Sequence, residues 1–215
     1  MRFLFMVVLG RLAIFLHFAK DSQLLKAYDV LLIDRPGYGY SDFGAGEMSI
    51  SKQASIFNEI ISQFNYKDVF LVGHSLGGPI ICLMCMERPK MYKGIQIVAG
   101  SVAPELEPHA WWRKPLNNKL IRWITPKSFR VSNQEIMHLP SELEKMTSHW
   151  SEITCDVQIL HGDRDKLVPR GNADYAKKML KNANSVVVFR YPELGHFIPF
   201  EYPEYRIEGL LSFGR

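Results

Sequence analysis

A serine lies between two glycines at residues 73–77 of this 215-residue chain, which read Gly-His-Ser-Leu-Gly. The apolar residues 69–72 before it predict a buried strand, and the apolar stretch 79–86 after it is long enough for a helix. A tight strand–turn–helix strains the serine backbone and leaves the hydroxyl exposed above the sheet, where helix N–H groups can stabilise negative charge. The pattern therefore predicts that Ser75 is a nucleophile; the alternative is a glycine-rich turn with a chance serine.

Two later segments carry side chains that could activate this serine. Residues 161–169 (HGDRDKLVP) follow the apolar run 157–160, and residues 193–197 (ELGHF) follow the run 185–189. If both runs are strands of a parallel sheet, these segments reach the same edge as Ser75. A serine hydroxyl is a poor nucleophile near pH 7 and needs a base, which in turn needs a carboxylate to orient it.

The chain between these motifs alternates between strand and helix patterns. Continuous apolar runs predict strands at 3–9, 28–33, 69–72, 94–99, 157–160 and 185–189, and helical spacing predicts helices at 49–65, 79–86, 173–180 and 204–213. Strands separated by helices predict a mostly parallel sheet with helices on its faces and right-handed crossovers. The fold class is therefore α/β.

The interval 101–156 is longer than one crossover needs and contains all four tryptophans of the chain. We expect it to form a small helical cap inserted into a core made of residues 1–100 and 157–215. One or two of the tryptophans should line an apolar substrate pocket, and the others should pack the cap against the core. The candidates are Trp111, Trp112, Trp123 and Trp150.

Residues 113–130 carry six basic and no acidic side chains. This basic run either forms a solvated face or attracts an anionic substrate or a membrane surface.

Composition and charge limit the kinds of binding partner and the cellular compartment that we expect. The chain is 47% apolar and 22% charged with a net charge of +4, which suits a globular protein and does not favour a nucleic-acid partner. Three cysteines cannot form a complete set of disulfides, so a reducing compartment is expected. Cys82 and Cys85 share one face of the predicted helix after Ser75 and are interpreted as buried thiols.

The first 20 residues are apolar but contain Arg11 and His17, and no small-residue cleavage site precedes Lys20. We interpret this segment as a core strand followed by a turn at Gly10, rather than as a membrane span or signal peptide. The predicted location is cytoplasmic; export or membrane association through this segment is the alternative. The oligomeric state stays open.

Four motifs together resemble those of the α/β-hydrolase-fold serine hydrolases, which include esterases and lipases. They are DRPGYGYSD at 34–42, GHSLGG at 73–78, HGDRDKLVP at 161–169 and ELGHF at 193–197, and they span roughly residues 24–205 in the family's order. The resemblance implies that Ser75 is the nucleophile, His196 the general base and acid, and Asp165 the orienting carboxylate. Asp163 is the rival for that last role. No metal or organic cofactor is implied, and His74 and His161 are interpreted as structural neighbours.

The N-terminal region departs from the family's pattern. Members carry a His-Gly loop after an early strand, and this loop supplies one N–H of the oxyanion hole. Residues 7–12 here read VVLGRL, without that histidine, and the family's first two strands are not recognisable. The Leu76 N–H is expected to be one donor and the Arg11 N–H the other. A start-site error, a truncated chain or a weakened enzyme would each give this pattern.

The sequence thus predicts a serine hydrolase that cleaves a carboxylic ester or related acyl compound through an acyl-enzyme on Ser75. The expected partner is a small acyl substrate with an apolar group of medium size. The same triad could instead transfer an acyl group or cleave a carbon–carbon bond. A weakly active or non-catalytic binding member of the fold is the remaining alternative.

Overall fold

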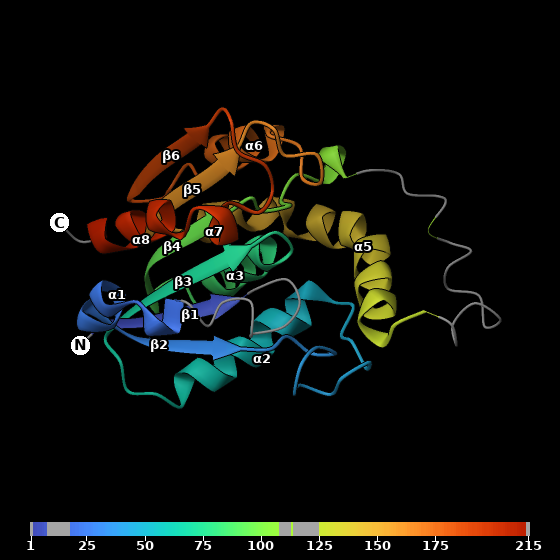
Figure 1. Ribbon diagram of the computed structural model, residues 1–215, viewed down its shortest axis with the longest axis horizontal. Coiled ribbons are helices and arrows are strands. Elements are labelled where there is room, and N and C mark those ends of the chain that lie inside the picture. Colours follow the sequence, from blue (N-terminus) through green and yellow to red (C-terminus); the bar gives the residue numbers. More distant parts are fainter. Residues whose placement is uncertain (1, 8–17, 108–112, 114–124, 214–215) are drawn as a thin grey trace.

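The computed structural model describes residues 2–7, 18–107, 113 and 125–213, and within them one sheet of six parallel strands forms the centre of the molecule (Figure 1). The strands are β1 (Arg2–Val7), β2 (Tyr28–Ile33), β3 (Asp68–His74), β4 (Tyr92–Val98), β5 (Asp156–Gly162) and β6 (Ser185–Tyr191). Their order across the sheet is β2-β1-β3-β4-β5-β6. The predicted strands and the parallel sheet are therefore confirmed.

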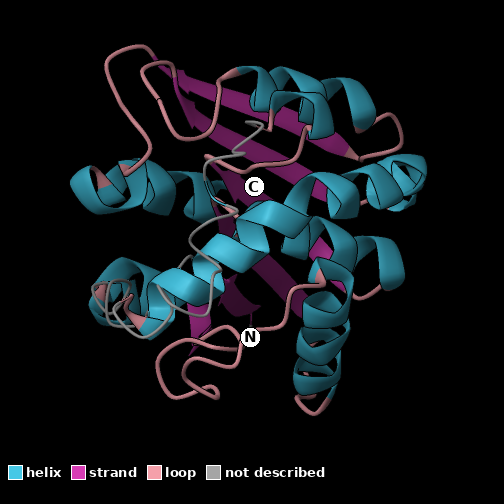
Figure 2. Cartoon of the chain, turned by 90° about the vertical axis from the view of Figure 1, so that its right-hand side faces the viewer, coloured by secondary structure: helices cyan, strands magenta, loops and turns pink. Residues whose placement is uncertain are grey.

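Helices lie on both sides of this sheet (Figure 2). They are α1 (Ser22–Ala27), α2 (Ile50–Ser62), α3 (Gly77–Glu87), α5 (Lys127–Met146), α6 (Gly171–Met179), α7 (Ile198–Glu201) and α8 (Pro203–Ser212), with short 3-10 turns at Phe18–Lys20, Pro104–Leu106 and Thr147–Glu152. One apolar core lies between the sheet and α2, α3, α5 and α6, and a second lies between the sheet and α1 and α8. A sheet covered on both faces takes apolar side chains at most strand positions, which is why the strands appear in the sequence as largely continuous apolar runs.

The strand β1 illustrates this arrangement. Phe3, Phe5 and Val7 belong to the first core, whereas Leu4 and Met6 belong to the second. It pairs with β2 on one side and with β3 on the other, so β1 is an inner strand of the sheet. The predicted turn at Gly10 lies outside the described residues.

The helix α3 is apolar around its whole circumference, and its residues 77–86 are buried. Cys82 and Cys85 lie on this helix as buried free thiols, as expected, and Cys155 is a third buried free thiol. Among the described residues, no helix is both long enough and apolar enough to cross a membrane.

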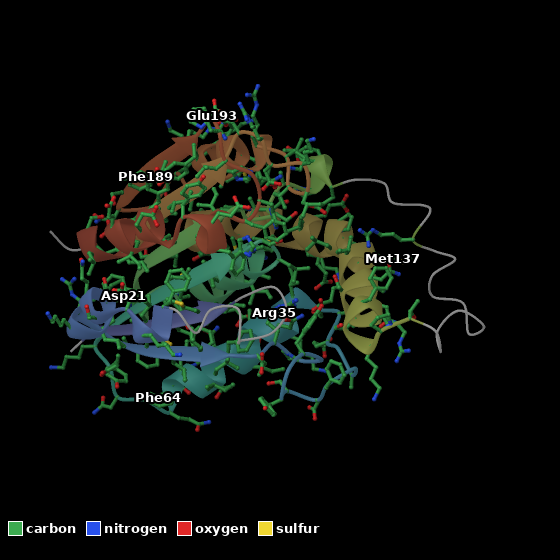
Figure 3. The ribbon with its side chains drawn as sticks, in the orientation of Figure 1. Asp21, Arg35, Phe64, Met137, Phe189 and Glu193 are labelled. Atoms are coloured by element: carbon green, nitrogen blue, oxygen red, sulfur yellow. The ribbon has the colours of Figure 1, made fainter. Side chains whose placement is uncertain are left out.

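The helix α5 and two 3-10 turns occupy the described part of the interval between β4 and β5. A buried ion pair joins α5 to the loop after β2: the Arg35 guanidinium donates to both carboxylate oxygens of Glu135, and the Tyr38 hydroxyl donates to Glu135 Oε2 at 2.7 Å. Figure 3 labels Arg35 in this loop and Met137 on α5. The division into a core and a helical cap stays a prediction, because much of 108–124 lies outside the described residues.

Candidate active site

Ser75 occupies the turn between β3 and α3 with a left-handed backbone, φ 56°. The turn is so tight that a Cβ on Gly73 would lie 2.3 Å from the carbonyl oxygen of Gly77, and a Cβ on Gly77 would lie 2.3 Å from that of Val7. The G-x-S-x-G spacing therefore has a steric cause, because only glycine fits at both positions. A non-glycine residue with positive φ is strained, and such strain gathers at functional sites.

His196 and Asp165 form a buried pair. The Nδ1 of His196 lies 2.7 Å from Asp165 Oδ2, while Asp165 Oδ1 accepts hydrogen bonds from the N–H groups of Leu167 and Val168, each at 2.8 Å. The carboxylate fixes the proton on Nδ1 of the neutral ring, so Nε2 is left as the acceptor. Burial alone would raise the pKa of Asp165, but the hydrogen bonds from His196 and the two backbone N–H groups outweigh burial and lower it.

Ser75 and His196 open into the same cavity, which has a volume of about 220 Å³. Its other lining residues are Leu76, Ser101, Glu107, Arg113, Ile136, Leu139, Leu167 and Val168. The helix α5 contributes Ile136 and Leu139, so the interval between β4 and β5 does form part of the wall beside the serine. Asp165 lies behind His196 and does not line the cavity.

Two further histidines support the turns that carry these groups. His74 Nε2 lies 3.0 Å from the carbonyl oxygen of His196, and His161 Nε2 lies 3.1 Å from that of Val168. Burial lowers the pKa of His161 despite the nearby Asp165 carboxylate. Neither ring lines the cavity beside Ser75.

Asp163, the rival of Asp165, faces a different partner. Its Oδ1 lies 3.6 Å from Nε of Arg190, and its backbone N–H donates to the Tyr191 carbonyl at 3.0 Å. Among the described residues, the only carboxylate hydrogen-bonded to His196 is that of Asp165. The structure therefore brings Asp165, and not Asp163, to the histidine.

The remaining predicted site residues divide into three groups. Leu76 lines the cavity at the N-terminus of α3, where backbone N–H groups have no acceptor within the helix. Arg11, Trp111, Trp112 and Trp123 lie outside the described residues, so the expectations for them stay predictions. Trp150 requires a correction: it is 1% exposed in the core, packs edge-on against Tyr175, and does not line the cavity. Its side chain therefore serves core packing.

Sequence patterns missed two polar residues of this cavity, Ser101 and Glu107, and indicated a third, Arg113, only as part of the basic run at 113–130. All three come from the connection between β4 and α5, which carries no recognisable motif. Burial raises the pKa of the Glu107 carboxyl, and the hydrogen bond from Ser101 only partly offsets this effect. Arg113 donates to Asn133 Oδ1 at 3.2 Å.

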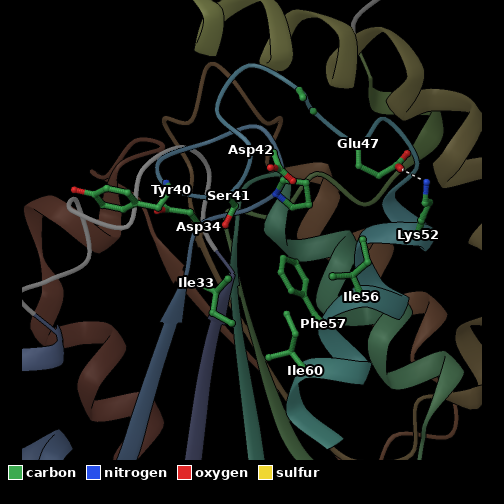
Figure 4. A pocket seen from close by; sticks show the side chains of 13 residues that line it. Ile33, Asp34, Tyr40, Ser41, Asp42, Glu47, Lys52, Ile56, Phe57 and Ile60 are labelled. Carbon is green, nitrogen blue, oxygen red and sulfur yellow. Dashed lines mark hydrogen bonds and ion pairs between the residues drawn. The ribbon is translucent and has the colours of Figure 1, made fainter. Parts of the chain in front are cut away.

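A second, larger pocket of about 430 Å³ lies between the loop after β2 and helix α2 (Figure 4). Ile33, Phe57 and Ile60 form its apolar side, and Glu47 within it is paired with Lys52 at 2.7 Å. Ser41 lines this pocket, but no histidine does. It therefore lacks the histidine of a Ser–His–Asp arrangement. Among the described residues, no group of three or more His, Cys, Asp or Glu side chains could hold a metal ion.

Comparisons with known proteins agree with the fold. The family model described as alpha/beta hydrolase fold matches residues 10–123. An uncharacterized hydrolase, YugF, of Bacillus subtilis is 22% identical over 242 aligned residues, which cover 95% of this chain and 87% of that protein. Monoglyceride lipase of Mus musculus is 29% identical over 139 residues, covering 59% of this chain and only 45% of the lipase. This chain thus aligns with less than half the length of the lipase.

Solved structures resemble the fold over nearly the whole chain. A lipase-esterase related protein from Clostridium acetobutylicum superposes with a TM-score of 0.75 at 19% identity, covering 99% of this chain and 94% of that one. Est816, described as an N-acyl homoserine lactone degrading enzyme, gives a TM-score of 0.73 at 17% identity, covering 99% and 93%. At this level of identity the likeness supports the fold alone.

Proposed function

Because the chain belongs to the alpha/beta hydrolase fold family, we propose that it is a serine hydrolase that cleaves a carboxylic ester or related acyl compound through an acyl-enzyme on Ser75. The observation that supports this most is the His196–Asp165 pair, 2.7 Å apart, with His196 opening into the same cavity as a strained serine. The names of the relatives, a hydrolase and a lipase, agree with hydrolysis of an acyl compound.

In the proposed acylation step, Ser75 Oγ attacks the substrate carbonyl while His196 Nε2 takes its proton. Asp165 holds the imidazole in the required tautomer and stabilises the imidazolium that forms. The tetrahedral intermediate then collapses, the bond to the alcohol oxygen breaks, and His196 returns the proton to the leaving alkoxide. Water, activated by the same histidine, then releases the acid and restores the serine.

The oxyanion of each intermediate needs two hydrogen-bond donors. The Leu76 N–H at the start of α3 is the first, and we propose the Arg11 N–H as the second. Loss of one such donor typically lowers kcat by ~10²–10³-fold. A small acyl substrate is the proposed partner. We propose a cytoplasmic location, because three buried free thiols suit a reducing compartment.

The proposal is tested by measuring hydrolysis of p-nitrophenyl acetate, butyrate and octanoate by the purified protein and by Ser75→Ala. We expect turnover in the wild type and a loss of at least ~10³-fold in Ser75→Ala, since residual activity then comes only from binding and the oxyanion hole. The thermal stability of the variant should change little. Ser41→Ala, a serine of the second pocket, is the matched control and should keep wild-type activity. Undiminished hydrolysis by Ser75→Ala would refute the proposal.

A further inference from the structure

A half-buried carboxyl group stands beside the proposed nucleophile without a role in the proposed chemistry. Glu107 lines the cavity that holds Ser75 and His196, and one of its carboxylate oxygens accepts a hydrogen bond from the Ser101 hydroxyl. Among the described residues, Ser101 is the only hydrogen-bond partner of the Glu107 carboxylate. Its second oxygen is therefore available to a bound molecule.

The backbone that carries Ser101 and Glu107 is fixed relative to the nucleophile. Ala99, at the end of β4, has a left-handed backbone with φ 44°, and the Ser101 N–H donates to the Ser75 carbonyl at 3.2 Å. The next two N–H groups, of Val102 and Ala103, both donate to the buried Asn172 Oδ1, at 2.7 and 2.8 Å. Strained backbone that is held from several sides is typical of a position built for function.

The surroundings of Glu107 favour a neutral hydrogen-bond donor as its ligand. Ile136, Leu139, Leu167 and Val168 give the cavity an apolar wall, which suits the hydrocarbon part of a substrate. Arg113 lines the same cavity, and its positive charge disfavours a cationic ligand. Among the described residues, no ion pair joins Glu107 to a basic group.

We propose that Glu107 determines specificity by accepting a hydrogen bond from a hydroxyl group of the substrate, so that the preferred substrate is a hydroxylated ester. A purely hydrocarbon ester would displace water from this carboxyl group without replacing its hydrogen bond, and a buried polar group left without a partner is costly. The proposal extends the function proposed above, since it concerns the substrate of the same serine.

A binding experiment tests the proposal without requiring turnover. The Ser75→Ala protein is titrated with 1-O-butylglycerol and with butyl propyl ether, which is the same molecule without its two hydroxyl groups. We expect the glycerol ether to bind about tenfold more tightly, as a hydrogen bond to a carboxylate would give. Adding Glu107→Leu should remove this advantage. Adding Glu105→Leu, an exposed residue of the same turn, should leave it in place.

Three results would overturn the proposal: no advantage for the glycerol ether, an advantage that survives Glu107→Leu, or tighter binding of 2-butoxyethyl-trimethylammonium, a cation without hydroxyls. If Glu107→Leu fails to fold, Glu107→Gln serves in its place. It keeps one acceptor oxygen without the charge, so we expect it to reduce the advantage at least about threefold, and an undiminished advantage would again overturn the proposal.

Hydrolysis rates then show which half of the ester carries the hydroxyl. The kcat/KM ratio of monobutyrin to propyl butyrate reports on the alcohol, and that of p-nitrophenyl 3-hydroxybutyrate to p-nitrophenyl butyrate reports on the acid. We expect Glu107→Leu to lower one of these ratios about tenfold. Absence of turnover with every ester, alongside the binding preference, would contradict the proposed hydrolase function and support the assignment of Glu107.

Discussion

At the scale of single residues, three turns bring Ser75, His196 and Asp165 together from distant parts of the sequence. They follow β3, β6 and β5, so all three lie at the carboxyl edge of one parallel sheet. One carboxylate oxygen of Asp165 is hydrogen-bonded to His196, and the other accepts hydrogen bonds from backbone N–H groups of its own turn. The same carboxylate therefore both orients the ring and shapes the loop.

Replacement of Asp165 tests this double role. Asp165→Asn places an amide against His196 Nδ1, which favours the wrong tautomer of the ring, so we expect kcat for p-nitrophenyl butyrate to fall by ~10³–10⁴-fold. Asp163→Asn is the matched control and should stay close to the wild type, because Asp163 faces Arg190. A larger loss in Asp163→Asn than in Asp165→Asn would reverse the assignment.

The buried His161 should make the folding stability of the protein depend on pH. Burial lowers its pKa below the ordinary 6.5, so the unfolded chain takes up a proton at this position more readily than the folded protein does. Its contribution to stability is therefore present above about pH 6.5 and decreases as the pH falls below that value. We expect the free energy of unfolding, measured with urea at a series of pH values, to fall less steeply on acidification in His161→Gln. Identical pH profiles for the two proteins would contradict this explanation.

At the scale of secondary-structure elements, α5 is fixed to the core by charge. Glu135 pairs with Arg35, whose side chain is fully buried, and Glu142 on the next turns of the same helix accepts from the Ser49 hydroxyl at 2.9 Å and the Ile50 N–H at 3.1 Å. These contacts hold Ile136 and Leu139 of α5 at the wall of the cavity beside Ser75.

Glu135→Gln should be strongly destabilising. It leaves the Arg35 charge buried without a carboxylate, and breaking a buried pair in this way costs about 3–5 kcal/mol. Glu59→Gln breaks the exposed pair with Arg88 and should cost only ~0–1 kcal/mol. Urea unfolding of the two variants compares them directly; equal losses of stability would show that the buried pair does not anchor the helix.

The packing of α3 against β1 gives a second prediction for the elements. In Gly77→Ala the new methyl group would meet the Val7 carbonyl oxygen at 2.3 Å, so we expect a loss of about 3 kcal/mol or more, seen as a lower thermal unfolding midpoint. In Gly195→Ala the nearest atom is 4.0 Å away, and stability should be nearly unchanged. A Gly77→Ala protein as stable as Gly195→Ala would show that the turn can move without cost.

At the scale of the whole molecule, local patterns predicted the parallel sheet and the positions of the three turns. Each strand appears in the sequence as an apolar run, and each catalytic motif follows such a run. Residues that are neighbours in the sequence are therefore enough to predict the sheet and these turns. The pairing of Arg35 with Glu135 spans 100 residues and leaves no local pattern. The same is true of the Ser101–Glu107 contact and of Asn172 beneath the Val102 N–H. The tryptophans were left as candidates for either a pocket wall or core packing, because the residue type does not distinguish the two, and the structure places Trp150 in the core.

The central claim is that Ser75 is an activated nucleophile, and covalent labelling tests it most directly. The folded protein is treated with a fluorophosphonate, digested, and analysed by mass spectrometry of the peptide that contains Ser75. We expect one adduct per chain on Ser75, no adduct in Ser75→Ala, and none after denaturation, since activation requires the assembled His196–Asp165 pair. An unlabelled folded protein, or a label on a different residue, would contradict the claim.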